Sequence, residues 1–153
     1  MRKFPSGKWG GSTLEFWPAP QHAPFRPFAA MMFIWKDEEA LLCKIPGRGW
    51  CIPSGRVEPN EEPKQAAIRE SYEEAGARLK NIRYLGAYRI SSKREIKWAE
   101  TFVGELDILE DIPIESEAED RLFVSLSEIP NVYHIWNPLF EKLFPYSLEV
   151  LKR

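Results

Sequence analysis

Runs of apolar residues along the chain predict a fold rich in β-strands. Residues 28–35 are apolar and strand-like, residues 36–39 turn the chain and residues 40–45 return, so this stretch predicts a β-hairpin. Four later runs also have the pattern of strands, and they lie at residues 50–52, 82–90, 96–108 and 122–126. Residues 1–27 are rich in proline and aromatic side chains, and only residues 13–17 within them are strand-like.

Two segments carry the signals of helix ends. A helix is predicted over residues 63–75, because Pro63 suits a first turn in which its missing N–H would have no partner. Gly76 suits a left-handed cap after the last turn. A second helix is predicted to start at residues 137–138, and Pro145 is expected to kink or split it.

The first predicted helix has an acidic side and an apolar side. At about 100° per residue, its side chains separate into Glu70, Glu73 and Glu74 on one side and Ile68, Tyr72 and Ala75 on the other. Three like charges at this spacing repel one another. Arg69 is expected to lie off to the side and not to neutralise all three. A hard divalent cation, which prefers carboxylate oxygens, would complete the compensation. A solvated acidic helix is the alternative for this side alone.

The order of these elements predicts an α/β architecture. Strands on both sides of the first helix, with a second helix at the end, indicate a mixed sheet covered on two faces. A chain of 153 residues is long enough to bury on the order of 70% of its unfolded surface around one core. We therefore expect a single domain over residues 1–153, with the segment 1–27 packed on it.

Composition narrows the classes of function. A net charge of −2, with both signs interspersed, predicts neither an extended nucleic-acid surface nor a membrane partner. The lack of a long apolar segment or signal-peptide core predicts a cytoplasmic location. Cys43 and Cys51 are expected to be buried reduced thiols, and His22 and His134 structural or surface residues. Carboxylate–metal chemistry is therefore the chemistry that this chain offers.

Residues 55–77 carry the most specific signal. They read GRVEPNEEPKQAAIRESYEEAGA and set, at fixed spacings, Gly55, Glu61, Arg69, Glu70, Glu73, Glu74 and Gly76. This spacing closely resembles the motif of the Nudix hydrolase family, G-x5-E-x7-R-E-U-x-E-E-x-G-U, where U is a bulky aliphatic residue. The chain departs from the motif at two packing positions, Ser71 and Ala77. Ser54 also replaces the more usual glycine before Gly55.

The resemblance implies a Nudix fold, which is an α/β/α sandwich with a mixed β-sheet. The ligands that it implies for Mg²⁺ or Mn²⁺ are Glu61, Glu70, Glu73, Glu74 and the carbonyl of Ser54. Arg69 would hold the loop and orient a glutamate through a bidentate bond, which lysine cannot reproduce. The implied reaction is attack of water on one phosphorus of a diphosphate linkage, in a nucleoside diphosphate joined to a further group.

The base that activates this water has candidates in two places. Members of the family use either a glutamate of the motif helix, here Glu73 or Glu74, or one from a later loop. Residues 115–120 form an acidic loop before the last strand, and we expect Glu117 or Glu119 to approach the metals from it. A solvated acidic loop is the alternative interpretation.

Substrate contacts are predicted outside the motif. Recognition of a base needs an aromatic platform and hydrogen bonds, and Trp98 is one candidate platform. Alternation places Glu100 among apolar groups, where a charge needs a partner or a site to serve. A bulge that exposes Glu100 is the alternative. Arg48 is a candidate contact to phosphate.

The size of the chain is similar to that of MutT-like nucleoside triphosphate pyrophosphohydrolases, and we expect a nucleotide-type small molecule as substrate. ADP-ribose, nucleotide sugars and the 5′ triphosphate end of RNA stay open as substrates. A non-catalytic, nucleotide-binding regulatory module is the alternative of a different class. The oligomeric state is left open, with a homodimer among the alternatives.

Overall fold

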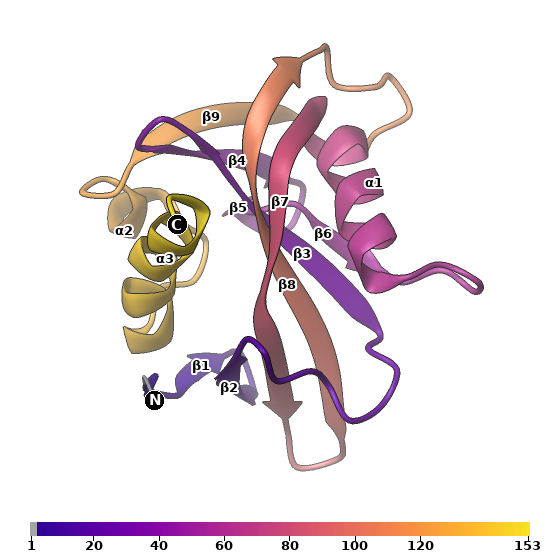
Figure 1. Cartoon of the computed structure of the whole chain (residues 1–153), viewed down its shortest axis with the longest axis vertical. Helices are drawn as coiled ribbons and strands as arrows, with labels where there is room; N and C mark the ends of the chain where they lie inside the picture. Colours follow the sequence, from indigo (N-terminus) through magenta and orange to yellow (C-terminus); the bar gives the residue numbers. More distant parts are fainter. Residues whose placement is uncertain (1–2) are drawn as a thin grey trace.

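A computed structural model describes residues 3–153 and shows a mixed β-sheet with helices on both faces (Figure 1). The strands are β1 (Gly7–Trp9), β2 (Ser12–Pro18), β3 (Ala29–Lys36), β4 (Glu39–Ile45), β5 (Gly49–Cys51), β6 (Ser54–Arg56), β7 (Ala77–Ser91), β8 (Ile96–Leu109) and β9 (Asp120–Ser125). The helices are α1 (Pro63–Ala75), α2 (Ile129–Val132) and α3 (Pro138–Leu151). The predicted α/β/α sandwich is confirmed.

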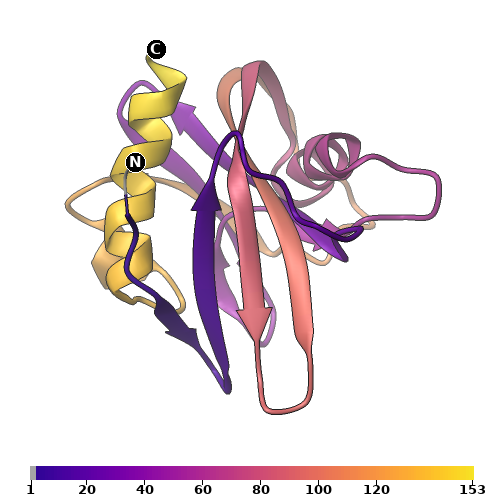
Figure 2. The ribbon, with the colours of Figure 1, turned by 60° about the horizontal axis from the view of Figure 1, so that its bottom comes forward.

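The sheet runs in the order β1-β2-β7-β8-β3-β4-β5, and β6 and β9 extend it by pairing with β3 and β4. Strands β7 and β8 form a long antiparallel hairpin, whereas β3 is parallel to β8 and places Ala30 opposite Glu100. Figure 2 shows that the sheet curls, with α3 on one side and α1 on the other. The curl brings segments from both ends of the chain near the central strand β3.

Strand β3 supports a core on each of its faces. Ala30 and Met32 point to the side covered by α1, and Phe33 and Trp35 point to the side covered by α3. Because both faces are covered, β3 is apolar at nearly every position instead of alternating with polar residues. As a result, α1 packs against β3 in the middle of the sheet.

Helix α1 spans the residues that the sequence predicts. Pro63 occupies its first turn, and the backbone N–H of Glu62 donates to the side chain of Gln65 (2.8 Å). Gly76 ends the helix in the left-handed conformation, with φ of 66°. The local signals at the two ends are therefore enough to place the helix.

The buried side of α1 differs from the predicted apolar side. Ile68 is 39% exposed and Tyr72 is only half-buried. The residues that face the sheet are Ala66, Ala67, Ser71, Glu74 and Ala75. Small side chains allow the helix to lie close to β3, and the Ser71 hydroxyl is satisfied by the Ala67 carbonyl (2.7 Å). The close approach decides which side is buried.

Helix α3 is one continuous helix, so the prediction that Pro145 could split it is wrong. Asn137 caps it by accepting a hydrogen bond from the N–H of Phe140 (2.9 Å). Pro145 and Glu141 are both exposed. The Glu141 carbonyl, which loses its usual donor to the proline, can therefore be hydrated.

The N-terminal segment adds two strands to the edge of the sheet. Strand β2 pairs with β7, close to the predicted residues 13–17, but β1 was not predicted. Gly7 lies so close to Asn137 that a Cβ atom would overlap its side chain, and Asn137 also donates to the carbonyl of Lys8 (3.0 Å). These contacts join β1 to the start of α3, and they set the position of the neighbouring Trp9.

Candidate active site

The motif begins where β6 runs past α1. Strand β6 pairs with β3, and Gly55 within it approaches the Glu70 side chain so closely that a Cβ atom would overlap the carboxylate. Only glycine fits at this position without movement of its neighbours. The backbone of the loop is therefore held directly against the acidic side of the helix.

Arg69 connects the loop to the helix. Its guanidinium binds Glu61 in bidentate fashion, with Nε–Oε2 and Nη2–Oε1 distances of 2.8 and 3.0 Å. It also donates to Glu70 (2.8 Å), to Glu73 (3.2 Å) and to the carbonyl of Arg56 (2.9 Å). Arg69 thus lies among these carboxylates and not off to the side. Its bidentate partner, Glu61, lies in the loop, and its remaining donors reach Glu70 and Glu73 on the helix.

Glu74 lies deeper than the other motif glutamates and outside this network. It is 4% exposed, and its Oε1 accepts a hydrogen bond from the backbone N–H of Ser54 (2.9 Å). Burial raises the pKa of Glu74 to about 8, although the bond from Ser54 acts in the opposite direction. Burial also raises the pKa of Glu70, against the opposing effect of Arg69.

The acidic side chains fit a divalent cation by their chemistry. Glu61, Glu70, Glu73 and Glu74 offer four carboxylates, and Arg69 compensates only part of their charge. The pKa of Glu74 is raised by its burial and then by the nearby Glu70 carboxylate, an effect that a bound cation would oppose. In residues 3–153 as they stand, no group of three acidic, histidine or cysteine side chains is arranged to hold a metal. Glu73 is the most exposed of these four candidates, and it shares Arg69 with Glu61 and Glu70.

The charge of Glu117 acts on two of the same carboxylates. Its negative charge contributes to the raised pKa values of both Glu70 and Glu74. Its loop is anchored to β4 through a hydrogen bond from Glu119 N–H to the carbonyl of Lys44 (2.9 Å). The Glu117 carboxylate itself is exposed.

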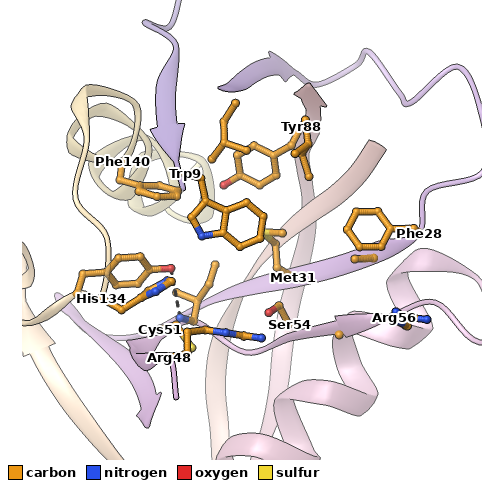
Figure 3. Close-up of a pocket in the computed structure, with 16 residues that line it drawn as sticks. Trp9, Phe28, Met31, Arg48, Cys51, Ser54, Arg56, Tyr88, His134 and Phe140 are labelled. Atoms are coloured by element: carbon orange, nitrogen blue, oxygen red, sulfur yellow. Dashed lines mark hydrogen bonds between the residues drawn. The ribbon is translucent and has the colours of Figure 1, made fainter. Parts of the chain in front are cut away.

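A cavity of about 240 Å³ opens beside the motif loop (Figure 3). Five aromatic side chains line it, and they are Trp9, Phe28, Tyr88, Tyr133 and Phe140. Ser54 and Gly55 of β6 form part of its wall, so the cavity and the acidic helix share one loop. A molecule bound in the cavity would therefore lie against the loop that also contacts Glu70 and Glu74.

Comparison with known proteins identifies the family. The family model described as the NUDIX domain matches residues 25–144. This chain belongs to the Nudix family.

Curated Nudix relatives match parts of the chain. The putative 8-oxo-dGTP diphosphatase YtkD of Bacillus subtilis is 39% identical over 70 residues, which are 46% of this chain and 44% of the relative. Diphosphoinositol polyphosphate phosphohydrolase 3-alpha of Mus musculus is 38% identical over 79 residues, which are 50% and 48% of the two chains. The chain thus matches about half the length of these relatives.

Solved structures extend the similarity over the whole fold. The Bacillus subtilis pyrophosphohydrolase BsRppH, solved in a mutant form, has a TM-score of 0.77 and 26% identity, and the match covers 99% of this chain and 96% of that chain. A C. elegans Ap4A hydrolase has a TM-score of 0.64 and 22% identity, with 81% and 96% of the two chains covered. The second likeness shows the Nudix fold alone.

The predicted substrate contacts divide between the two faces of the sheet. Arg48 lines the cavity, whereas Trp98 and Glu100 are absent from the described residues that line it. Alternation along β8 explains this, because Ala99 lies opposite Tyr88 on the cavity side and its two neighbours face the other way. Trp98 packs edge-on against Trp17, with ring centroids 4.7 Å apart.

Glu100 is buried, so the alternative of an exposed residue at a bulge is wrong. Its Oε2 accepts a hydrogen bond from the N–H of Ala23 (3.0 Å) and lies 3.0 Å from His22 Nδ1. The Tyr84 hydroxyl lies 3.3 Å from the same oxygen, and its ring stacks on His22. Glu100 therefore holds the N-terminal segment on the sheet, on the face opposite the cavity.

Several residues of the cavity could not be predicted from the sequence. Tyr133, His134 and Phe140 come from the segment between α2 and α3, which has no motif, and from the first turn of α3. His134, expected to be structural or on the surface, lines the cavity, and burial lowers its pKa. Cys51 lines the cavity as well, and lies opposite Cys43 with both thiols buried and free, as predicted.

No helix in the described part of the chain combines the length and the apolar composition that crossing a membrane requires.

Proposed function

We propose that the protein is a Mg²⁺-dependent hydrolase that splits a diphosphate linkage of a nucleoside triphosphate, in the manner of MutT-like pyrophosphohydrolases. The observation that carries this proposal is the shared loop, since Ser54 and Gly55 form the wall of an aromatic cavity and also contact the acidic helix. A base in the cavity would present its phosphates to the motif. Relatives named as diphosphatase and pyrophosphohydrolase support the reaction class.

The motif residues would divide the work of hydrolysis. Glu61, Glu70, Glu73, Glu74 and the Ser54 carbonyl would hold one or more divalent cations. A bound cation would supply positive charge to offset the phosphates. Arg69 would keep the loop and helix in register through its bidentate bond to Glu61. Glu117 would take the proton from the attacking water, because its charge acts on buried Glu74 while the residue itself is exposed.

The lining of the cavity distinguishes between substrate classes named among the relatives. A diphosphoinositol polyphosphate carries phosphates around its ring, and the cavity wall is mainly aromatic and aliphatic. An aromatic wall favours a flat base over a polyanionic ring. We therefore place nucleoside triphosphates ahead of diphosphoinositol polyphosphates as substrates of this chain.

A substrate panel with Mg²⁺ tests the proposal. It contains the nucleoside triphosphates, ADP-ribose, a 5′-triphosphate RNA oligonucleotide and a diphosphoinositol polyphosphate, and released phosphate and pyrophosphate are measured separately. The expected result is turnover of nucleoside triphosphates with Mg²⁺ or Mn²⁺ and none in chelator, and Glu73→Gln serves as the matched inactive control. Nucleotide binding without turnover in either metal would instead support a regulatory module.

A further inference from the structure

One polar atom beside the cavity has no partner. Among the buried side-chain nitrogen and oxygen atoms of residues 3–153, only the Tyr88 hydroxyl lacks a hydrogen-bond partner. The residue is 1% exposed, so bulk water does not replace the missing bond. An unpaired buried polar group is costly, and such groups in folded proteins call for an explanation.

Tyr88 forms part of the cavity wall. Figure 3 shows its ring standing beside the Trp9 indole, with the hydroxyl oxygen on the side of Trp9 and Phe140. The rest of the ring is held by the core, where it packs edge-on against Phe16 with centroids 5.6 Å apart. The ring is therefore positioned by the fold, and its hydroxyl has no partner among the described residues.

Neighbouring polar groups offer donors. The Tyr133 hydroxyl already accepts a hydrogen bond from Ile52 N–H (3.4 Å), which leaves its own proton to donate. Burial raises the pKa of Tyr88, with a further contribution from Tyr133, so both phenols keep their protons at neutral pH. The Trp9 indole N–H and the Arg48 guanidinium are donors only. A ligand that pairs with these donors must supply hydrogen-bond acceptors.

We propose that Tyr88 determines substrate specificity by donating its O–H to a ring carbonyl of the base bound in the cavity. A carbonyl oxygen has two lone pairs and can accept from Tyr88 and Tyr133 together. The cavity, at about 240 Å³, is smaller than pockets of about 300–1,000 Å³ that hold drug-sized ligands, so it suits a single ring system. The inference rests on the proposed function for the identity of the ligand as a base.

The substitution Tyr88→Phe removes only this hydroxyl, so it tests the contribution of that group. The variant keeps the ring and its contact with Phe16, and it removes the atom that has no partner in the fold. Its thermal midpoint should therefore equal or exceed that of the wild type. Tyr84→Phe is the matched control, because the Tyr84 hydroxyl donates to the Gln21 carbonyl (2.7 Å) outside the cavity. This control should lower the thermal midpoint without changing base preference.

The test compares inosine 5′-triphosphate, which has a carbonyl on its six-membered ring, with purine riboside 5′-triphosphate, which lacks it. The wild type should prefer the carbonyl substrate by about tenfold in kcat/KM, and Tyr88→Phe should reduce this preference to about twofold or less. An unchanged preference in Tyr88→Phe, or a thermal midpoint several degrees lower, would overturn the role of Tyr88.

A binding measurement separates this inference from the proposed function. Inosine and purine riboside are titrated in the absence of metal, and tryptophan fluorescence reports binding because Trp9 lines the cavity. The wild type should bind inosine more tightly by several-fold, and Tyr88→Phe should bind the two equally. If the wild type cleaves neither triphosphate, the proposed function fails, while the titration still supports or refutes the role of Tyr88.

Discussion

At the scale of single residues, Arg69 and Gly55 determine how the motif loop meets the helix. Arg69 binds carboxylates from both elements, and Gly55 leaves no room for a side chain beside Glu70. The two features act together, since the close approach allowed by glycine brings the loop within reach of the guanidinium. The motif therefore encodes a contact between the loop and the helix as well as the proposed cation ligands.

The bidentate bond to Glu61 makes Arg69 difficult to replace. Arg69→Lys should lower kcat by about 10- to 100-fold while the protein stays folded, because an ammonium group cannot hold Glu61, Glu70 and Glu73 at once. Steady-state kinetics and circular dichroism would measure the two effects. Arg78→Lys, at an exposed pair with Glu110, is the control. Wild-type rates in Arg69→Lys would show that catalysis does not require the contact of Arg69 with both the loop and the helix.

The two loop glutamates are expected to behave differently. Glu117→Gln should lower kcat by about two to four powers of ten with metal affinity nearly intact, because Glu117 is the proposed base and its charge acts on Glu70 and Glu74. Glu119→Gln should have little effect. Single-turnover kinetics and metal titration would be compared for both. If neither changes the rate while Glu74→Gln abolishes it without loss of metal, the base lies on α1.

At the scale of elements, the packing of α1 depends on small side chains. Ala66, Ala67 and Ala75 are fully buried against the sheet, whereas Ile68 is largely outside that contact. Ser71, at a position where the family motif has a bulky aliphatic residue, is also fully buried. A small residue there is consistent with a helix that lies close to β3, and the hydroxyl has a partner within the helix.

Two substitutions on neighbouring positions test this packing. Ala67→Leu should lower the free energy of unfolding by about 1–3 kcal/mol, because no space exists for the added atoms. Ile68→Lys should change it by less than about 0.5 kcal/mol, since the side chain is substantially exposed. Urea denaturation of both variants provides the measurement. The reverse ranking would mean that Ile68 faces the core, as its position on the helix first predicts.

At the scale of the whole molecule, the cavity is assembled from distant segments. Trp9 comes from the N-terminal hairpin, Tyr88 from the middle of the sheet and His134 from the segment before α3. The contact of Gly7 with Asn137 joins the first and last of these. The shape of the cavity therefore depends on the closure of the whole chain around β3.

The stability of the folded protein should depend on pH through His134. Burial, and then Arg48, lower its pKa in the folded protein, whereas the unfolded chain has the ordinary value of about 6.5. The unfolded state thus binds the proton more readily, so this contribution to stability is present above about pH 6.5 and is lost as the pH falls. Thermal midpoints measured from pH 8 to pH 5 should fall more steeply for the wild type than for His134→Gln. Parallel curves would remove His134 from this role.

The sequence alone determined the local features of this protein. Pro63 and Gly76 placed both ends of α1, the motif spacing identified the acidic helix and its loop, and apolar runs located most strands. These features depend on neighbours within a few residues, such as caps, turns and alternation, which are readable from the order of side chains. The family resemblance rested on the same local spacing.

The tertiary structure decided everything that depends on contacts between distant residues. It selected the buried side of α1, separated Trp98 and Glu100 from the cavity, and brought Tyr88 beside Trp9. Strand pairing and the curl of the sheet set these contacts, and central strands such as β3 and β7 pair with strands far away in sequence. A periodic pattern states that a side chain faces inward, but the packing of neighbouring elements determines whether it meets the core or a site.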